Sequence, residues 1–170
     1  MTAILRPTPT ARIRDDSPPT SVVEAAVALA LALVAGIVEA LARAAEAGPT
    51  DLMTTLLTFM PRLLLYGVVA VVIRQLLHSR RWALWALLIG IGGIGTASLV
   101  VDPIIWLASG PDIRGVVAGW SALEWLAAAA RTVHLAAVLI AVVLLLRPAT
   151  WRFVRRERRP RQDSNLRHLL

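Results

Sequence analysis

Four long apolar stretches constrain this chain more than any other feature. They cover residues 22–45, 52–77, 82–101 and 120–146, and turn residues or charged residues separate them. A helix rises ~1.5 Å per residue, so about 20 residues cross the ~30 Å hydrocarbon core of a bilayer. With 57% of its 170 residues apolar and a mean hydropathy of +0.67, the chain has too little polar cover for a soluble domain. We therefore expect an all-α, polytopic membrane protein built as a bundle of four transmembrane helices.

The segments around these stretches define the rest of the organisation. Residues 1–20 carry four prolines and no apolar periodicity, which predicts a disordered tail ahead of a membrane domain at 21–146. We expect Asp102-Pro103 to end the third span, leaving residues 102–119 as an extracytoplasmic loop. A cleaved signal peptide is the alternative for the first stretch, but this run exceeds the usual ~7–15 apolar residues and contains Glu24, so a span is favoured.

Arginine positions predict the orientation. All 18 basic residues are arginines, which is typical of a GC-rich genome and therefore of a bacterium. Three arginines lie at the junction of the second and third spans, namely Arg74, Arg80 and Arg81, and seven lie within residues 147–161, whereas Arg114 is the sole arginine of the 102–119 loop. Because arginine-rich flanks stay in the cytoplasm, we expect both ends inside, in the bacterial cytoplasmic (inner) membrane.

The basic tail at residues 147–170 has its own expected partner. Arginines near a membrane surface attract anionic lipid headgroups by ~1 kcal/mol each, so the tail needs no nucleic acid to explain its charge. Within it, residues 163–170 begin Asp-Ser-Asn-Leu-Arg, which resembles a translated antisense strand of a tRNA gene. We expect this last segment to be read-through without a selected function.

Ionisable residues inside the spans are the candidates for function. Arg62 lies ten positions beyond Leu52, ~15 Å deep, where an arginine costs ~2.5–3.5 kcal/mol on insertion scales. Tyr66 follows one helical turn later on the same polar stripe. We predict one polar cluster in the outer half of the bundle, formed by Glu39, Arg62, Tyr66, Asp102, Glu124, Arg131 and His134.

Two interpretations of this cluster stay open. In the structural one, Glu39 pairs with Arg131 or Arg62 to fix helix register, while Glu124 and Asp102 lie among the headgroups. In the functional one, the cluster is a proton or substrate site. The leading hypothesis is accordingly a non-enzymatic accessory or interaction subunit that packs against itself or a membrane partner. The alternative is a small homodimeric transporter or proton-coupled carrier.

The run Gly90-Ile-Gly-Gly-Ile-Gly95 matches the letters of a dinucleotide-binding fingerprint, but it lies inside an apolar span rather than between a strand and a helix. We interpret it as a helix-packing face, as we do Gly36 in the first span. The packing pairs are Gly92 with Thr96 and Gly93 with Ala97. Since the chain has no cysteine and His134 is the one histidine within a predicted span, we expect no cofactor and no metal.

One resemblance is visible in the third and fourth spans. The Arg-Arg-Trp-Ala-Leu-Trp-Ala-Leu-Leu opening of the third span, and His134 leading into an apolar run that ends in Arg147-Pro148, resemble small four-span membrane proteins of high-GC actinobacteria. The resemblance covers about residues 52 to 153 and implies a membrane fold without implying an activity.

Overall fold

The computed structural model describes residues 17–48 and 51–155, except for the side chains of Leu52, Thr58, Ser98 and Asp102. Residues 1–16 of the tail predicted at 1–20, and residues 156–170 of the tail predicted at 147–170, including the read-through segment 163–170, lie outside the described residues. In the described residues the order of elements is α1 (Thr20–Ala47), α2 (Leu52–Leu77), α3 (Arg81–Ala86), the π-helix η1 (Leu87–Gly95), α4 (Thr96–Ala108), α5 (Ile113–Ala118), α6 (Ala122–Leu146) and α7 (Pro148–Arg155).

Four helical runs are long and apolar enough to cross a membrane, as the sequence predicts. They are α1, α2, the continuous run formed by α3, η1 and α4, and α6. The shortest has 25 residues, or about 37 Å of helix, which exceeds the ~30 Å hydrocarbon core. Their outer faces are apolar: Leu64, for example, is 72% exposed. Such surfaces suit a lipid environment rather than water.

The third apolar run is longer than expected. We predicted an end at residue 101, but α4 continues through Pro103 to Ala108. Proline lacks the amide hydrogen that would bond to the carbonyl four residues earlier, here that of Leu99. This carbonyl instead accepts a 2.7 Å hydrogen bond from Nη2 of Arg131 on α6. Because the freed acceptor has a partner on another helix, the proline is accommodated and the connection to α6 begins only after Ala108.

Local capping signals determine where helices begin and end. Asp51 and Asp112 cap α2 and α5, each accepting a hydrogen bond from the backbone amide three residues later. Ser121 and Glu124 form a reciprocal capping box at the start of α6. Each cap satisfies amides that lack a partner within the helix, a contribution of about 1 kcal/mol. Gly48 ends α1 with a φ of 76°, a conformation that favours glycine.

The glycine-rich run is helical. It forms η1, whose wider π turns are rare and are often found at functional sites. A Cβ atom added at Gly92 would lie 3.0 Å from Cγ2 of Val142 on α6, so this glycine permits a close approach of the two helices. Gly93 and Ala97 are exposed instead, and Thr96, the first residue of α4, donates to the carbonyl of Ile91 in η1 at 3.1 Å.

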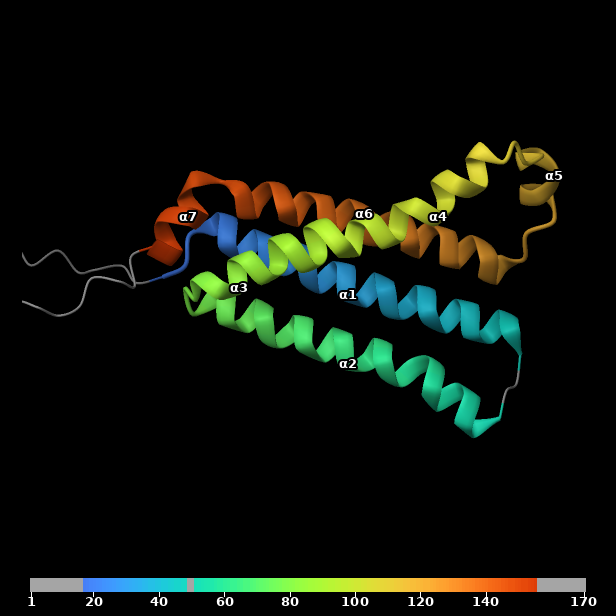
Figure 1. Cartoon of the computed structure of the whole chain (residues 1–170), viewed down its shortest axis with the longest axis horizontal. Coiled ribbons are helices and arrows are strands. Elements are labelled where there is room, and N and C mark those ends of the chain that lie inside the picture. Colours follow the sequence, from blue (N-terminus) through green and yellow to red (C-terminus); the bar gives the residue numbers. More distant parts are fainter. Residues whose placement is uncertain (1–16, 49–50, 156–170) are drawn as a thin grey trace, which may run out of the picture.

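The most extensive contact between helices joins α1 and α6, which lie side by side in Figure 1. The buried positions of both helices are mostly small, with alanines and Gly36 on α1 and alanines on α6. Small residues let two helix backbones approach closely. The other helices pack less tightly: α2 contacts mainly α1 and α3, and η1 contacts α6.

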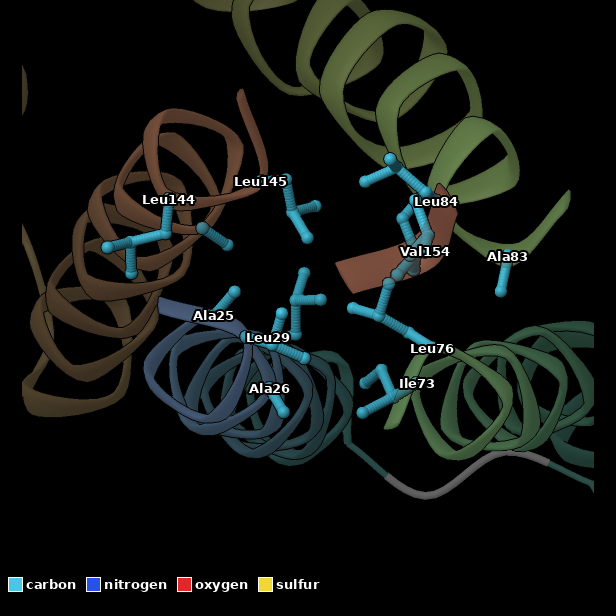
Figure 2. Packing of buried hydrophobic residues seen from close by; sticks show 13 residues of the cluster. Ala25, Ala26, Leu29, Ile73, Leu76, Ala83, Leu84, Leu144, Leu145 and Val154 are labelled. Atoms are coloured by element: carbon cyan, nitrogen blue, oxygen red, sulfur yellow. The ribbon is translucent and has the colours of Figure 1, made fainter. Parts of the chain in front are cut away.

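The main apolar core lies at the end of the molecule where α1 begins and α6 ends. Side chains from α1, α2, α3, η1, α6 and α7 form it, and Figure 2 shows how they meet. Its fully buried members include Val22, Leu29, Leu76, Leu84, Leu145 and Val154. Toward the other end α2 and α4 diverge: in Figure 1, α2 runs to one side of the molecule and α4 to the opposite side. We call the end that holds this core the tight end, and the end where α2 and α4 diverge the open end.

Helix α7 closes the tight end. We predicted a basic tail from residue 147, and its first eight residues beyond Arg147 form this helix. Thr150 is fully buried, lies 3.1 Å from the hydroxyl oxygen of Ser21 on α1, and donates to the Leu144 carbonyl at 3.0 Å. The Trp151 ring contacts Trp85 edge to face at 5.3 Å between centroids. These contacts attach α7 to the helices that it follows.

Candidate functional site

A cavity of about 670 Å³ lies between all four long helices, toward the open end. Its size falls within the ~300–1,000 Å³ range of small-molecule sites. Its polar lining residues include several members of the predicted cluster together with one residue outside it, namely Glu39, Arg43, Arg62, Tyr66, Arg131 and His134. This polar lining comes from α1, α2 and α6, and the run of α3, η1 and α4 contributes apolar residues and glycines to the wall.

The lining residues lie at three depths along the helix axes: a charged tier with Glu39, Arg62 and Arg131, a deeper tier with Tyr66 and His134, and an apolar base. Counted from the helix ends at the open side, Glu39, Arg62 and Arg131 lie eight to ten residues in, or about 12–15 Å deep. His134 and Tyr66 lie deeper, at about 18–21 Å by the same rise. The floor beyond them is apolar and is formed by residues such as Leu29, Val72 and Val138. The cavity is therefore charged near its mouth and apolar at its base.

Glu39 and Arg131 form the central ion pair of the charged tier. Arg131 Nη1 lies 3.7 Å from Oε1 of Glu39, and both side chains are largely buried, with exposed fractions of 28% and 14%. The second terminal nitrogen of Arg131 donates to the Leu99 carbonyl that Pro103 leaves free. Arg131 thereby connects α1, α4 and α6. This arrangement matches the structural interpretation in which such a pair fixes helix register.

Arg43 is a lining residue that sequence reasoning missed. Its Nε donates to Oε1 of Glu39 at 3.2 Å, so two arginines share one carboxylate oxygen. The signal was present in the sequence, because residues four apart on a helix are neighbours and a glutamate precedes the arginine. Glu46 was also missed: it accepts a 2.9 Å hydrogen bond from the Ser121 hydroxyl and so joins the end of α1 to the start of α6.

Gly36 brings the deeper tier together. A Cβ atom at this position would lie 2.9 Å from both Nδ1 of His134 and the hydroxyl oxygen of Tyr66. Two polar atoms, one from α6 and one from α2, therefore contact the backbone of α1 at the same glycine. Within the part of the chain that the structure describes, the buried Nδ1 of His134 has no hydrogen-bond partner. A buried nitrogen of this kind is costly unless a water or a ligand satisfies it.

Arg62 differs from the other arginines of the lining. It is exposed to the cavity and, among the described side chains, it makes no ion pair and no hydrogen bond. The adjacent Pro61 lies inside a continuous α2, so the helix carries Arg62 directly into the charged tier. This guanidinium group is therefore available to a ligand.

The remaining members of the predicted cluster lie elsewhere. Glu124 does not line the cavity; its carboxylate accepts a 2.7 Å hydrogen bond from the Ser121 amide at the N-terminus of α6. Asp102 is part of α4, and its side chain lies outside the described atoms. Of the predicted packing residues, Gly36 lines the cavity and Gly92 packs near it, whereas Gly93 and Ala97 face outward.

The charge of the cavity lining suits an anion. Among the described residues there is no group of three or more His, Cys, Asp or Glu side chains that could hold a metal ion. The described lining instead contains three arginines against one glutamate. Guanidinium groups bind carboxylates and phosphates through paired hydrogen bonds.

Comparisons with known proteins identify no relative from which a function could be inferred. No family model matches the chain, and neither the curated proteins nor the solved structures contain a significant match.

Proposed function

We propose that this chain is a non-enzymatic, multi-pass membrane protein that binds a small amphiphile in the cavity and works as a carrier. The observation that carries the proposal is a cavity assembled from four helices, with paired and unpaired arginines above an apolar base. Intramembrane charges of this kind commonly mark substrate or ion pathways. A protein that only anchors a partner has no need of such a lining.

Two glycines provide a test of ligand binding. Gly90 lines the cavity, and a Cβ atom there would meet nothing within 4 Å, so Gly90→Leu adds bulk to the cavity wall without a clash at its Cβ atom. Gly67 is equally unobstructed but faces outward from α2, which makes Gly67→Leu the matched control. A spin-labelled lysophospholipid should show a motionally restricted component with the wild type that Gly90→Leu reduces and Gly67→Leu preserves. Equal restricted fractions in all three proteins would contradict the proposal.

We further propose a four-helix bundle with both ends in the cytoplasm of a bacterial cell, embedded in its cytoplasmic membrane. The tight end carries arginines at the α2–α3 turn and on α7, whereas Arg114 is the arginine of the connection around α5. The six tryptophans also divide by end, as expected for aromatic belts: Trp82, Trp85 and Trp151 at the tight end, and Trp106, Trp120 and Trp125 at the open end.

The orientation can be tested with single cysteines, because the chain has none of its own. His78→Cys and Ser109→Cys introduce thiols at opposite ends, both at exposed positions. A membrane-impermeant maleimide applied to intact cells should label the cysteine at 109 and not the one at 78. Labelling of 78 alone would reverse the orientation and place the mouth of the cavity in the cytoplasm.

Exposed Arg152 and Arg155 extend the proposal to lipids at the tight end. The Arg155 guanidinium carbon lies 5.9 Å from the centre of the Trp151 ring, which places a cation beside an aromatic residue suited to the interface. We propose that α7 contacts anionic headgroups of the cytoplasmic leaflet, in keeping with the proposed kinship to small actinobacterial four-span proteins.

A second candidate is an accessory subunit that pairs with itself or with another membrane protein. The observation that favours it is the exposed pair Gly93 and Ala97; among the described residues, a Cβ atom at Gly93 would lie within 4 Å only of the Leu88 carbonyl oxygen of its own helix. Small outward residues permit close approach by another helix. Gly93→Leu should then lower the yield of cross-linked oligomer in membranes while leaving the cavity occupied. Unchanged cross-linking would remove this candidate.

A further inference from the structure

We propose that the ligand of the cavity is an amphiphile with a phosphate ester headgroup, that Arg62 binds the phosphate, and that the apolar chain occupies the base. This inference rests on the proposed function, because it specifies what the same cavity binds. It follows from three observations: the charge of the lining, the lack of a partner for Arg62 among the described side chains, and the order of the tiers.

The charge of the lining selects an anion. The described residues contribute three arginines and one glutamate, which leaves two positive charges in excess. Placing charge in a bilayer without compensation costs several kcal/mol, so this excess favours a bound anion. A phosphate monoester carries about −1.5 to −2 charges at pH 7 and several strong acceptor oxygens. It would balance the excess more fully than a carboxylate, which carries one charge.

Arg62 is the arginine suited to bind the headgroup. Arg43 and Arg131 both contact Glu39, and Arg131 also donates to the Leu99 carbonyl. Arg62 lies at the same depth on the opposite wall and has no such partner among the described side chains. A guanidinium group about 15 Å inside a membrane helix costs ~2.5–3.5 kcal/mol on insertion scales unless it is paired or hydrated. A phosphate group would provide that pairing through two hydrogen bonds.

Below the charged tier, donors continue the recognition. The Tyr66 hydroxyl and the unpartnered Nδ1 of His134 both adjoin Gly36, one tier deeper than Arg62. The Tyr66 hydroxyl, on a residue that lines the cavity, can contribute a hydrogen bond to an ester or glycerol oxygen that lies beneath the phosphate. A headgroup bound in this way would occupy two tiers and leave the apolar base to its chain.

The base of the cavity then explains why the ligand needs a chain. Leu29, Val72 and Val138 contribute apolar walls that a free phosphate would leave unfilled. Each buried methylene group of a ligand contributes about 0.8 kcal/mol. The ligand would be oriented with its phosphate toward the mouth.

Three related molecules separate the sources of this chemistry. Lysophosphatidic acid carries both phosphate monoester and chain, lysophosphatidylcholine carries the same chain with a zwitterionic headgroup, and glycerol 3-phosphate carries the headgroup alone. Binding of each is measured by calorimetry on the full chain in phosphatidylcholine nanodiscs. We expect lysophosphatidic acid to bind at least about tenfold more tightly than either of the others, since each lacks one part of the recognition.

Variants of Arg62 test its assigned role. Arg62→Gln should weaken lysophosphatidic acid by about tenfold or more, to the level of lysophosphatidylcholine. Arg62→Lys should retain part of the affinity, because it keeps the charge and loses the paired geometry. Arg114→Gln is the matched control, since Arg114 is exposed on α5 outside the cavity, and it should bind as the wild type does. Retained helicity and elution volume exclude misfolding as the cause.

The outcomes distinguish this inference from the proposed function. If the two lysophospholipids bind equally, Gly90→Leu abolishes both and Arg62→Gln changes neither, the cavity binds amphiphiles but the phosphate assignment is wrong. If glycerol 3-phosphate binds as tightly as lysophosphatidic acid, the ligand is a soluble phosphate and the role of the apolar base is wrong. If no molecule of the series binds and Gly90→Leu has no effect, the proposed function itself fails.

Discussion

Gly36 offers the most direct test of the geometry at the centre of the molecule. Gly36→Ala adds one Cβ atom at a point 2.9 Å from His134 Nδ1, 3.1 Å from His134 Cε1 and 2.9 Å from the Tyr66 hydroxyl oxygen. Carbon atoms do not approach other heavy atoms so closely, so α2 or α6 must shift or both rings must rotate. Overpacking of this kind costs about 1–3 kcal/mol.

The control for this change is Gly67→Ala. Both substitutions replace glycine by alanine inside a helix, which by itself stabilises the helix by about 0.8–1 kcal/mol. At Gly67 a Cβ atom meets nothing within 4 Å, so this gain is undiminished there. The difference in the free energy of unfolding between the two variants therefore isolates the overpacking term, and we expect Gly36→Ala to be less stable by about 1–3 kcal/mol.

The measurement is unfolding by sodium dodecyl sulfate in mixed micelles, followed by circular dichroism. A second substitution, Tyr66→Phe, removes one of the two polar atoms beside Gly36 and should recover part of the loss in the double variant, with the remainder due to His134. Gly36→Ala and Gly67→Ala equal within about 0.5 kcal/mol would refute the close contact of three helices at this glycine.

Three further predictions concern single hydrogen-bonding groups. Thr150→Val should lower the free energy of unfolding by about 1–3 kcal/mol, because it leaves a buried partner unsatisfied. Thr132 is the control: it is exposed and bonds to the Ala128 carbonyl of its own helix, so Thr132→Val should cost less than about 0.5 kcal/mol. Chemical unfolding measures both. Arg131→Leu should cost roughly 1.5–3 kcal/mol, the range for hydrogen bonds to charged groups, and a stability equal to that of the wild type would contradict its role in joining helices. Hydrogen bonds from Thr54 lower the pKa of Asp51 from its ordinary value of 3.8. The stabilising contribution of this cap is therefore complete above that pH and is lost as the pH falls through the lower folded-state pKa. Thr54→Val should raise the pKa of Asp51 measured by NMR, and an unchanged pKa would count against the cap.

The helices themselves were largely predictable from the sequence, because hydropathy and helix rise together determine how many residues cross a bilayer. The end of the third helix was not. An Asp-Pro pair normally indicates a stop, since the proline frees a carbonyl four residues earlier. Here the Arg131 side chain, 32 residues further along the chain, satisfies that carbonyl at Leu99. Local rules cannot anticipate a hydrogen-bond partner that only the tertiary fold supplies.

The candidate site shows a similar division. Helical spacing alone placed Arg62 and Tyr66 on one stripe, and both line the cavity. Glu124 was assigned to the cluster for its charge, although the Ser121-Ala-Leu-Glu124 capping box that uses its carboxylate is readable in the sequence. The role of Gly36 required the fold, because its sequence context indicates close packing without indicating that two polar groups would be what packs there.

The two interpretations that the sequence left open divide between two arginines. Arg131 is committed to Glu39 and to the Leu99 carbonyl; its removal leaves that carbonyl without its partner and leaves Glu39 with Arg43 alone. Arg62 has no such commitment among the described side chains, so its replacement by glutamine removes a charge that the fold itself does not use. The structural and functional roles should therefore separate in one experiment. Loss at Arg131 should lower stability first, whereas loss at Arg62 should leave stability close to that of the wild type and abolish the preference for phosphate. If both substitutions lowered stability equally and neither altered ligand binding, the charged tier would serve helix register alone.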